Sequence, residues 1–398
     1  MTSSDSTFRV PCAAWYNARM KLITRNAAFR VGAILLVFAG VLWCMCGRPG
    51  RGQRLMAPPV IPAAALRAHV QALAGEIGER NVFRPAALAR AADYIEGQWR
   101  QQGYEVTRQP FTADGVTCAN LEAVRRGNSE MIVVGAHYDS VCGTAGANDN
   151  ASGVASLLEL SRVFANGSDG APLSRTIRFV AFVNEEPPFF RTDQMGSRVY
   201  ARACRQRGDD VRAMIALETM GCYSDVPGSQ QYPPAFRWFY PDRGNFIAFV
   251  SDLRSRGLMH RAAGAFRAHS GFPVECCATF ARVTGVDWSD HGSFWREGYR
   301  GFMVTDTAPF RYAHYHQSSD TPDKVDCAAL ARVTQGLCGV VASLALPGAT
   351  KLSVYTNFLE LRERFGHKRP RHVYPTFHRQ PRFRQSSLGT PTVKSCIP

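Results

Sequence analysis

Apolar and polar positions along the chain form blocks that predict helices and strands in turn. Two helical patterns near 63–75 and 85–103 precede two alternating, strand-like segments at 104–111 and 117–124. Apolar, often β-branched runs then predict buried strands at 131–136, 176–183, 213–217 and 301–305. Further helical patterns lie at 154–166, 195–206, 244–257 and 327–346. This order predicts an α/β fold, with a largely parallel mixed central sheet flanked by helices in a single domain.

The segments outside this body differ from it in composition. Residues 31–46 (VGAILLVFAGVLWCMC) form one apolar run behind a basic N-terminal segment, 1–30. A Gly-, Pro- and Arg-rich linker is predicted at 47–61, and the folded domain at 62–350. Residues 361–398 are rich in Arg, His, Pro and Gln and show no periodicity, which predicts a basic, disordered tail.

The apolar run at 31–46 predicts contact with a membrane. Its 16 residues are fewer than the about 20 that span a bilayer and more than the about 7–15 of a signal peptide. Basic residues precede the run and no clean cleavage signal follows it, so we predict an uncleaved signal anchor. The folded domain would then be membrane-anchored and extracytoplasmic. Cleavage of the segment would instead give a secreted or periplasmic protein.

The net charge of +15 resides mostly at the two ends of the chain. Residues 1–54 contain eight Lys or Arg and one acidic residue, and residues 359–398 contain nine and two. The body between these ends is therefore almost neutral, with a net charge of +1. Because a nucleic-acid groove requires a basic body, we expect no nucleic-acid partner.

Metal-binding residue types gather where the predicted strands end. They are His137 and Asp139, Asp149, Glu185 and Glu186, Glu218, and His316. Sites in open α/β sheets form at the carboxyl ends of strands, so these side chains are expected to converge. Imidazole and carboxylate ligands suit zinc, whereas the sequence contains no C-x-x-C pair to support a thiolate site. For Asp149, Asn150 and Ser152, capping of the next helix is the alternative interpretation.

Five such ligands exceed what one tetrahedral ion with an open position needs. Two zinc ions that share one carboxylate fit the set, and such a pair activates a water molecule and stabilises a tetrahedral intermediate. Glu185, which stands beside a ligand, is then free to accept the proton of that water. Asp139 follows His137 by two residues and can accept the second ring N–H of that imidazole.

Four motifs in this order carry a family resemblance: HYDS at 137–140, NDNASG at 148–153, NEEPPFF at 184–190 and YHQSSDTPDKVD at 315–326. They resemble the motifs of the co-catalytic zinc aminopeptidases of the bacterial leucyl aminopeptidase type. That family also contains relatives of glutamate carboxypeptidase and of glutaminyl cyclase. The resemblance covers about residues 62–348 and implies a zinc exopeptidase-like catalytic domain.

The resemblance implies a role for each residue of the set. His137 and Glu218 would bind one zinc ion, Glu186 and His316 would bind the other, and Asp149 would bridge them. Glu218 stands where Asp is frequent, but zinc accepts either carboxylate. The H-x-x-x-D-T pattern that follows His316 distinguishes this ligand from the histidine two residues before it.

Further roles follow from the same resemblance. Glu185 would be the general base and acid, and Tyr315 would donate a hydrogen bond to the developing oxyanion. Asp139, Asp290 and His291 would form a supporting shell around the ligands. Asn148 occupies a position where many members have Asp, and only the following Asp is needed as a ligand.

The resulting hypothesis is a zinc-dependent exopeptidase, an aminopeptidase that removes N-terminal residues from peptide substrates. Carboxypeptidase action is an alternative within the family. Glutaminyl cyclases typically use one zinc and lack the His137-type ligand, and non-catalytic ectodomains of this fold lose ligands or the base, so the complete set argues against both. The substrate pocket is expected to include some of Phe189, Phe190, Tyr223 and Phe310.

Overall fold

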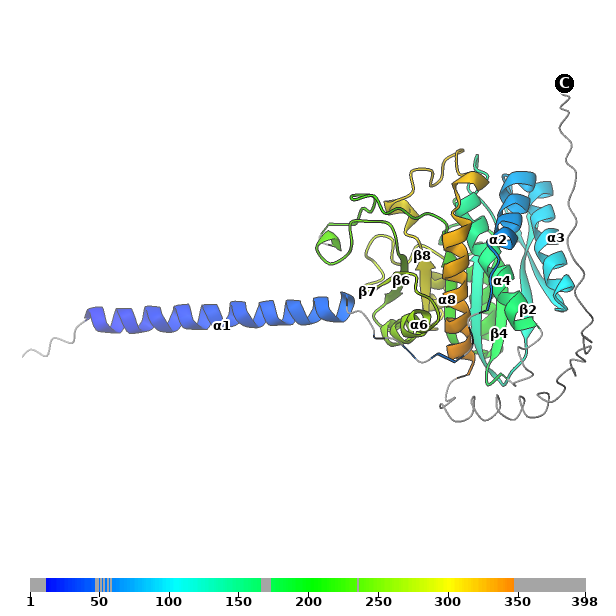
Figure 1. The fold of residues 1–398 in the computed structure, drawn as a ribbon. Coiled ribbons are helices and arrows are strands. Elements are labelled where there is room, and N and C mark those ends of the chain that lie inside the picture. Colours follow the sequence, from blue (N-terminus) through cyan, green and yellow to red (C-terminus); the bar gives the residue numbers. More distant parts are fainter. Residues whose placement is uncertain are drawn as a thin grey trace, which may run out of the picture. The chain divides into compact units, whose positions relative to one another are not determined.

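The computed structural model describes residues 12–46, 50, 52, 54–55, 57, 59–165, 173–234 and 236–346. The tail predicted at 361–398 and parts of the linker predicted at 47–61 lie outside the described residues. Eight strands form one mixed sheet in the order β1-β2-β4-β3-β5-β8-β6-β7 (Figure 1). The predicted α/β class, with a mixed central sheet flanked by helices, is confirmed.

The strands are β1 (Val106–Ala113), β2 (Val116–Arg125), β3 (Glu130–His137), β4 (Thr176–Phe182), β5 (Asp210–Glu218), β6 (Ile247–Asp252), β7 (Val274–Thr279) and β8 (Gly301–Thr305). The α-helices are α1 (Cys12–Cys46), α2 (Ala63–Val70), α3 (Pro85–Gln101), α4 (Gly153–Ala165), α5 (Gly196–Arg207), α6 (Arg256–His269), α7 (His291–Arg296) and α8 (Cys327–Ala345). Shorter or irregular helical segments are η1 (Gln71–Ile77), η2 (Ala147–Ser152), η4 (Phe236–Trp238), η5 (Ala308–Phe310) and η6 (Pro322–Lys324).

The centre of the sheet is parallel. β4, β3, β5 and β8 run in the same direction, so their carboxyl ends reach one edge of the sheet. At that edge His137 pairs with Phe182 across β3 and β4, and Glu218 pairs with Thr305 across β5 and β8. The β1–β2 hairpin extends the sheet antiparallel to β4, and β6, with β7 parallel to it, runs antiparallel to β8.

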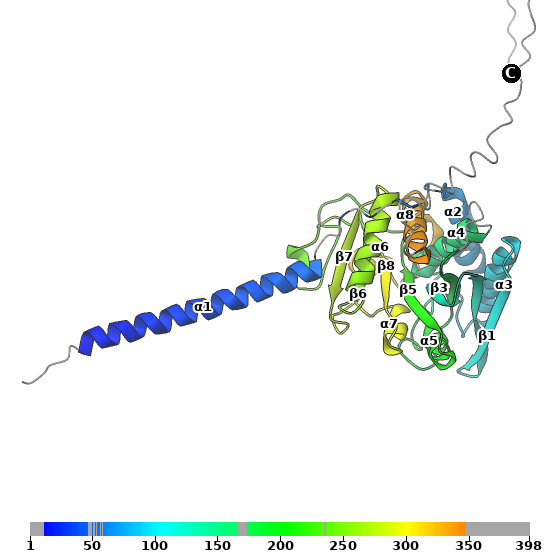
Figure 2. The same ribbon diagram turned by 90° about the horizontal axis from the view of Figure 1, so that it is seen from below.

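Helices cover both faces of the sheet. Figure 2 shows α4, α6 and α8 on one face, and α5 and α7 on the other. Alternation along β3 explains the two layers: Ile132 and Val134 join the main core, whereas Met131 and Val133 join the cluster that includes side chains of α5 and α7. Because both faces are buried, the central strands are nearly continuous apolar runs in the sequence.

The prediction of a helix at 244–257 is wrong. The structure places β6 at Ile247–Asp252, and α6 begins only at Arg256. A short apolar run does not distinguish a buried strand from a buried helix by its periodicity. Pairing with β8 and β7 decides in favour of the strand, and β7 has no counterpart among the predicted strands.

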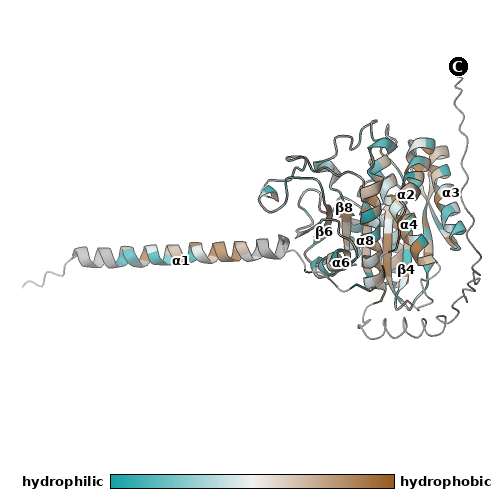
Figure 3. Cartoon of the chain, in the orientation of Figure 1, coloured by the Kyte–Doolittle hydropathy of each residue, from teal (hydrophilic) through white to brown (hydrophobic). Residues whose placement is uncertain are grey.

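Two of the described helices are long and apolar enough to cross a membrane by length and composition alone. One is the Arg19–Gly40 part of α1, whose side chains, where described, are almost all exposed. Figure 3 shows a hydrophilic stretch of this helix followed by a hydrophobic one. The other is α8, which is mostly buried and is therefore a core helix of the domain. Membrane contact by α1 stays a prediction.

Candidate metal centre

The five predicted metal ligands come from the carboxyl edge of the central sheet. His137 and Glu218 are the last residues of β3 and β5. Glu186 lies shortly after β4, Asp149 lies in η2 before α4, and His316 lies in the loop after β8. The parallel sheet thus brings together side chains that are far apart in the sequence, as expected for this class of fold.

Three of these side chains converge at one position. His137 Nε2 lies 3.3 Å from Asp149 Oδ1 and 3.3 Å from Glu218 Oε2. Glu185 Oε2 is farther away, at 3.8 Å from the same nitrogen. His137 is fully buried, yet neither of its ring nitrogens has a hydrogen-bond partner. Buried polar atoms are normally bonded, so this cluster lacks a partner that completes it.

A second position lies at the other oxygen of Asp149. His316 Nε2 lies 3.1 Å from Asp149 Oδ2 and 3.3 Å from Glu186 Oε2. His316 Nε2 and Glu186 Oε1 are also buried atoms without a hydrogen-bond partner. One ligand atom each of His137, Asp149 and Glu186 lies within 4.8 Å of the other two. Asp149 therefore faces a different histidine with each of its carboxylate oxygens, as a bridging ligand does.

Unusual backbone conformations direct these loops. Asn184, Thr219 and His316 have positive φ angles of 60°, 41° and 57°. Such angles cost energy in residues other than glycine, and they cluster at functional sites. Gly146 also has a positive φ, and a Cβ there would collide with the backbone oxygen of Asp149. Glycine at this turn thus permits the approach of the chain that presents Asp149.

Asp139, predicted to accept the second ring N–H of His137, supports the site through two backbone hydrogen bonds. Its Oδ1 accepts the backbone N–H of Glu185 and its Oδ2 accepts that of Glu186, each at 3.1 Å. The same Oδ1 lies 3.5 Å from His137 Nδ1. One carboxylate thereby fixes the loop after β4 relative to the end of β3.

Two further residues, Asp320 and Ser289, hold the predicted ligands, and neither is among the predicted site residues. Asp320 accepts the backbone N–H groups of Asn148, at 2.9 Å, and of Asp149, at 3.1 Å. It lies within the motif that follows His316, so that motif also anchors the bridging residue. Ser289 Oγ donates to Glu218 Oε2 at 2.8 Å.

Arg80 is a buried cation that no sequence signal indicates. Its side chain is fully buried and donates to five backbone carbonyls: those of Leu73, Gly78, Tyr138, Ala145 and Gly146. The last three lie between His137 and Asp149 in the sequence. Arg80 therefore holds the loop that joins one ligand to the bridging ligand.

The site gathers more negative charge than its own cations balance. Six of the predicted site residues are buried carboxyl groups: Asp139, Asp149, Glu185, Glu186, Glu218 and Asp290. Burial raises the pKa of Glu185 well above its usual value and that of Glu186 to about 8. Burial also opposes ionisation of Asp149, but the two histidines hold its pKa well below its usual value. Unpartnered imidazole and carboxylate atoms amid surplus negative charge fit divalent cations, and this donor set suits zinc.

The remaining predicted residues have different surroundings. Tyr315 stacks on His316, with ring centroids 3.9 Å apart. Asp290 is fully buried, and burial raises its pKa to about 7. His291 bonds through Nε2 to the carbonyl of Val286 at 2.8 Å and packs edge-on against Trp295. Tyr315 thus adjoins a ligand, whereas the contacts of His291 lie within its own segment.

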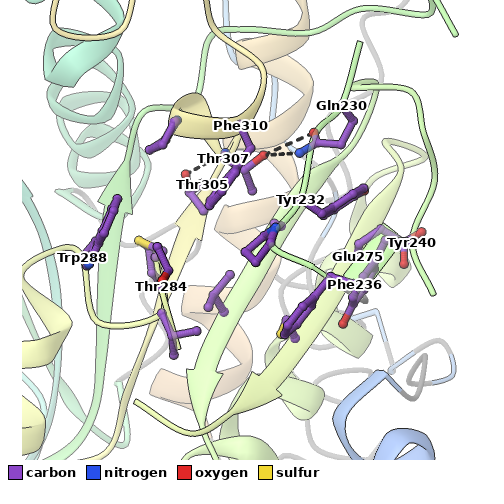
Figure 4. Close-up of a pocket in the computed structure, with 18 of the residues that line it drawn as sticks. Gln230, Tyr232, Phe236, Tyr240, Glu275, Thr284, Trp288, Thr305, Thr307 and Phe310 are labelled. Atoms are coloured by element: carbon purple, nitrogen blue, oxygen red, sulfur yellow. Dashed lines mark hydrogen bonds between the residues drawn. The ribbon is translucent and has the colours of Figure 1, made fainter. Parts of the chain in front are cut away.

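A cleft opens beside Glu218 and Tyr315 and continues over β6, β7 and β8. Figure 4 shows the side chains that line it, most of them apolar or aromatic. Its walls come from the loop that contains Tyr232 and Phe236 and from the loop that contains Trp288. The centre therefore adjoins a mostly apolar cleft with a few polar groups, which is the character of a substrate site.

The prediction of pocket residues is correct for one of four. Phe310 lines the cleft. Phe189 belongs to the main core, Phe190 lines a separate small pocket, and Tyr223 packs against Phe272. Each of these four residues lies close to a predicted ligand in the sequence. The cleft, however, is built by loops of the β6–β8 half of the sheet.

The fold and the site together are those of a zinc-dependent peptidase, a hydrolase that acts on peptides. The chain belongs to peptidase family M28, whose family model matches residues 119–341. The uncharacterised protein YfbL of Escherichia coli K12 is 38% identical over 260 residues, which are 63% of this chain and 78% of YfbL. Leupeptin-inactivating enzyme 1 of Streptomyces exfoliatus is 34% identical over 140 residues, 34% of this chain and 32% of that enzyme.

Solved structures share the fold. LapB from Legionella pneumophila matches with a TM-score of 0.58 and 23% identity over 72% of this chain and 73% of LapB. BSAP, a zinc aminopeptidase from Bacillus subtilis, matches with a TM-score of 0.56 and 15% identity over 74% of this chain and 98% of BSAP. The structural likeness shows the fold, and the family match confirms the predicted resemblance.

Proposed function

We propose that the chain is an aminopeptidase that uses two zinc ions bridged by Asp149. The observation that carries the proposal is the position of that carboxylate, 3.3 Å from His137 Nε2 through one oxygen and 3.1 Å from His316 Nε2 through the other. We assign Glu218 to the ion at His137 and Glu186 to the ion at His316. Membership in family M28 supports the peptidase part of the proposal, and the fold is shared with a zinc aminopeptidase.

Zinc bound there would supply Lewis acidity, which lowers the pKa of a water molecule and polarises a carbonyl group. Glu185 is the proposed general base. Burial raises its pKa well above the usual value, so this carboxyl can hold a proton between accepting it from water and delivering it to the leaving amine. The hydrogen bond that the backbone N–H of Glu185 donates to Asp139 fixes the position of Glu185.

Tyr315 is the proposed hydrogen-bond donor to the developing oxyanion. Its ring is held against His316 and lines the cleft. Burial raises the pKa of Tyr315 far above its usual value, and the neighbouring carboxylates raise it further. The phenol therefore stays protonated and can donate, which is the property that an oxyanion donor requires.

The distribution of charge favours the amino end of a peptide. Among the described residues that line the cleft there is no Lys, Arg or His. A carboxypeptidase needs such a cation to bind the terminal carboxylate of its substrate. The surplus of carboxylates attracts an α-amino group instead. These charges support an aminopeptidase over the carboxypeptidase alternative.

Peptides that differ only in their blocked end test the proposal. The purified chain would be given a leucyl peptide with a free N-terminus and the same peptide after N-acetylation, with and without a chelator, and its metal content would be measured. We expect leucine to be released from the free peptide only, in a zinc-dependent reaction. Release of the C-terminal residue from the acetylated peptide would establish a carboxypeptidase. An inert chain that takes up no zinc would indicate a binding domain.

We also propose that α1 anchors the protein in a membrane. Its Arg19–Gly40 part combines sufficient length with exposed apolar side chains that follow a basic stretch. Cell fractionation followed by an alkaline carbonate wash tests this. The full chain is expected in the washed membrane pellet, whereas a chain that begins at residue 50 is expected in the supernatant. Recovery of the full chain in the supernatant would contradict the anchor.

A further inference from the structure

One wall of the cleft is a long loop with little regular structure. It joins β5 to β6 over residues 219–246, and we call it the wall loop. Among its described residues the only helical segment is η4, which has three residues. Gln230, Tyr232 and Phe236 of this loop line the cleft, and Figure 4 shows them on one side of it. Long loops without regular structure are uncommon in compact domains, so the contacts that fix this one decide the shape of the cleft.

Arg311 fastens both ends of the wall loop with one side chain. Its Nη1 donates to the carbonyl of Cys222, at 3.3 Å, near the start of the loop. The same nitrogen donates to the carbonyls of Gly244, at 2.9 Å, and Phe246, at 2.8 Å, at the end of the loop. The guanidinium group also stands over the ring of Phe246, 4.4 Å from its centroid. These contacts hold the two ends of the loop together.

The same side chain supports the part of the wall loop that faces the cleft. Arg311 Nε donates to Gln230 Oε1 at 2.7 Å, and Gln230 Nε2 donates to Thr307 Oγ1 at 3.1 Å (Figure 4). Gln230 and Thr307 both line the cleft. Beside them, the backbone N–H of Gln231 donates to the carbonyl of Phe310 at 2.8 Å. The position of the wall at Gln230 therefore depends on Arg311 and on the residues around it.

Arg311 belongs to the segment that carries the predicted ligand His316, which follows it by five residues. The next residue, Tyr312, donates from its hydroxyl group to Asp320 at 2.7 Å. Asp320 in turn accepts the backbone N–H of Asp149. One segment after β8 thus contacts both the wall loop and the metal centre.

The contacts of Arg311 require a guanidinium group. Its donors lie in one rigid plane and reach acceptors on several sides at once. A lysine would offer a single nitrogen on a flexible chain, which cannot bind the ends of the wall loop and Gln230 in the same geometry. The positive charge would remain. Replacement by lysine therefore tests the geometry of these contacts and not the charge.

We propose that Arg311 is a positioning residue that holds the wall loop in the shape that binds the first side chain of a peptide. The inference rests on the aminopeptidase function proposed above, because that function places the first residue at the metal centre, where the cleft begins. A long side chain reaches the wall loop, whereas the methyl group of alanine stays near the centre. A displaced wall loop should therefore weaken the binding of long first residues more than that of alanine.

Phenylalanyl and alanyl 4-nitroanilides test the inference in the zinc-loaded chain. We expect the unmodified chain to have the higher kcat/KM for the phenylalanyl substrate. Arg311→Lys should lower the ratio of the two values on the order of 10-fold, the effect of losing one hydrogen bond to a charged group. The loss should appear in KM for the phenylalanyl substrate, with zinc content unchanged. The matched control Arg205→Lys makes the same exchange at an exposed position of α5 and should keep the ratio.

A second buried arginine shows what a different role would look like. Arg80 holds the loop between His137 and Asp149 and has no bond to the wall loop among the described residues. Arg80→Lys should weaken zinc binding and lower turnover of both substrates together, so the ratio should stay unchanged. Arg311→Lys should give the opposite pattern.

The outcomes separate the two proposals. An unchanged ratio in Arg311→Lys, or an equal loss on both substrates, would overturn the role of Arg311 and leave the aminopeptidase standing. Equal values of kcat/KM for the two substrates in the unmodified chain would do the same. Failure of the unmodified chain to cleave either substrate or a leucyl peptide would refute the proposed function itself.

Gly244→Ala perturbs the same contact if Arg311→Lys does not fold. A Cβ at Gly244 would lie 3.1 Å from Arg311 Cδ and 3.2 Å from Arg311 Nε, so the arginine side chain must shift. The ratio should fall in this variant as well. An unchanged ratio there would also overturn the role of Arg311.

Discussion

Replacement of Asp139 by asparagine tests how the site is held together. The carboxylate accepts the backbone N–H groups of Glu185 and Glu186, one with each oxygen, both at 3.1 Å. Asparagine has the same shape, but its NH₂ group must face one of these donors. One of the two hydrogen bonds is then replaced by a contact between two donors. The oxygen that faces His137 Nδ1 at 3.5 Å also loses its charge.

The size of the effect follows from these contacts. A hydrogen bond to a charged group contributes about 1.5–3 kcal/mol. Loss of a group that orients metal ligands typically lowers metal affinity about 10–100-fold, which corresponds to about 1.4–2.7 kcal/mol. These two free energies are similar in size. The hydrogen bond that is lost is one of the two that position Glu185 and Glu186. We therefore expect Asp139→Asn to bind zinc about 10–100-fold more weakly.

A competition titration against a fluorescent zinc chelator measures this affinity. Asp323→Asn is the matched control, since Asp323 is exposed and bonds only near the surface, to Thr321 and Lys324. The control should bind zinc as the unmodified chain does. Equal zinc affinity and equal turnover in Asp139→Asn would refute the argument that this carboxylate positions the site.

Three further outcomes are expected. Glu185→Gln should keep its zinc and lose about 10²–10⁴-fold in kcat, measured on a leucyl substrate. In the metal-free protein, burial raises the pKa of Glu186 to about 8. Burial lowers the pKa of His316, but hydrogen bonds to carboxylates outweigh this effect and raise that pKa to about 10. Both shifts stabilise the fold at low pH, so Tm of the chelated protein should fall between pH 6 and 9, and zinc should abolish this fall. Arg80→Met should lower the free energy of unfolding by at least about 3 kcal/mol in urea titrations.

The central part of the fold could be predicted because its strands are buried on both faces. β3, β4, β5 and β8 are mostly apolar runs. β3, β5 and β8 end at a polar residue, and β4 is followed by Asn184 two residues after its end. The predicted ligands His137 and Glu218 stand at two of those ends, and the other three lie in segments that follow them, so the strand ends indicate where these side chains come together. The β6–β7 region lacks such clear ends, and its periodicity fits a helix or a strand.

Other residues of the site were beyond the reach of the sequence because their roles depend on tertiary contacts. Arg80 acts on carbonyls near Tyr138 and Gly146, some sixty residues away. Glu275 lines the cleft only because β7 pairs with β6 and so extends the sheet beneath it. No local pattern of residues encodes either contact. Asp320 is the intermediate case, since it lies in one motif and its partners Asn148 and Asp149 lie in another, but neither motif shows that the two meet.

The most direct test of the two-ion centre is anomalous X-ray diffraction at the zinc absorption edge, from crystals of the zinc-loaded chain. We expect two peaks on either side of the Asp149 carboxylate, one beside His137 and Glu218 and the other beside His316 and Glu186. A single peak at full zinc saturation, or two peaks that Asp149 does not bridge, would contradict the account.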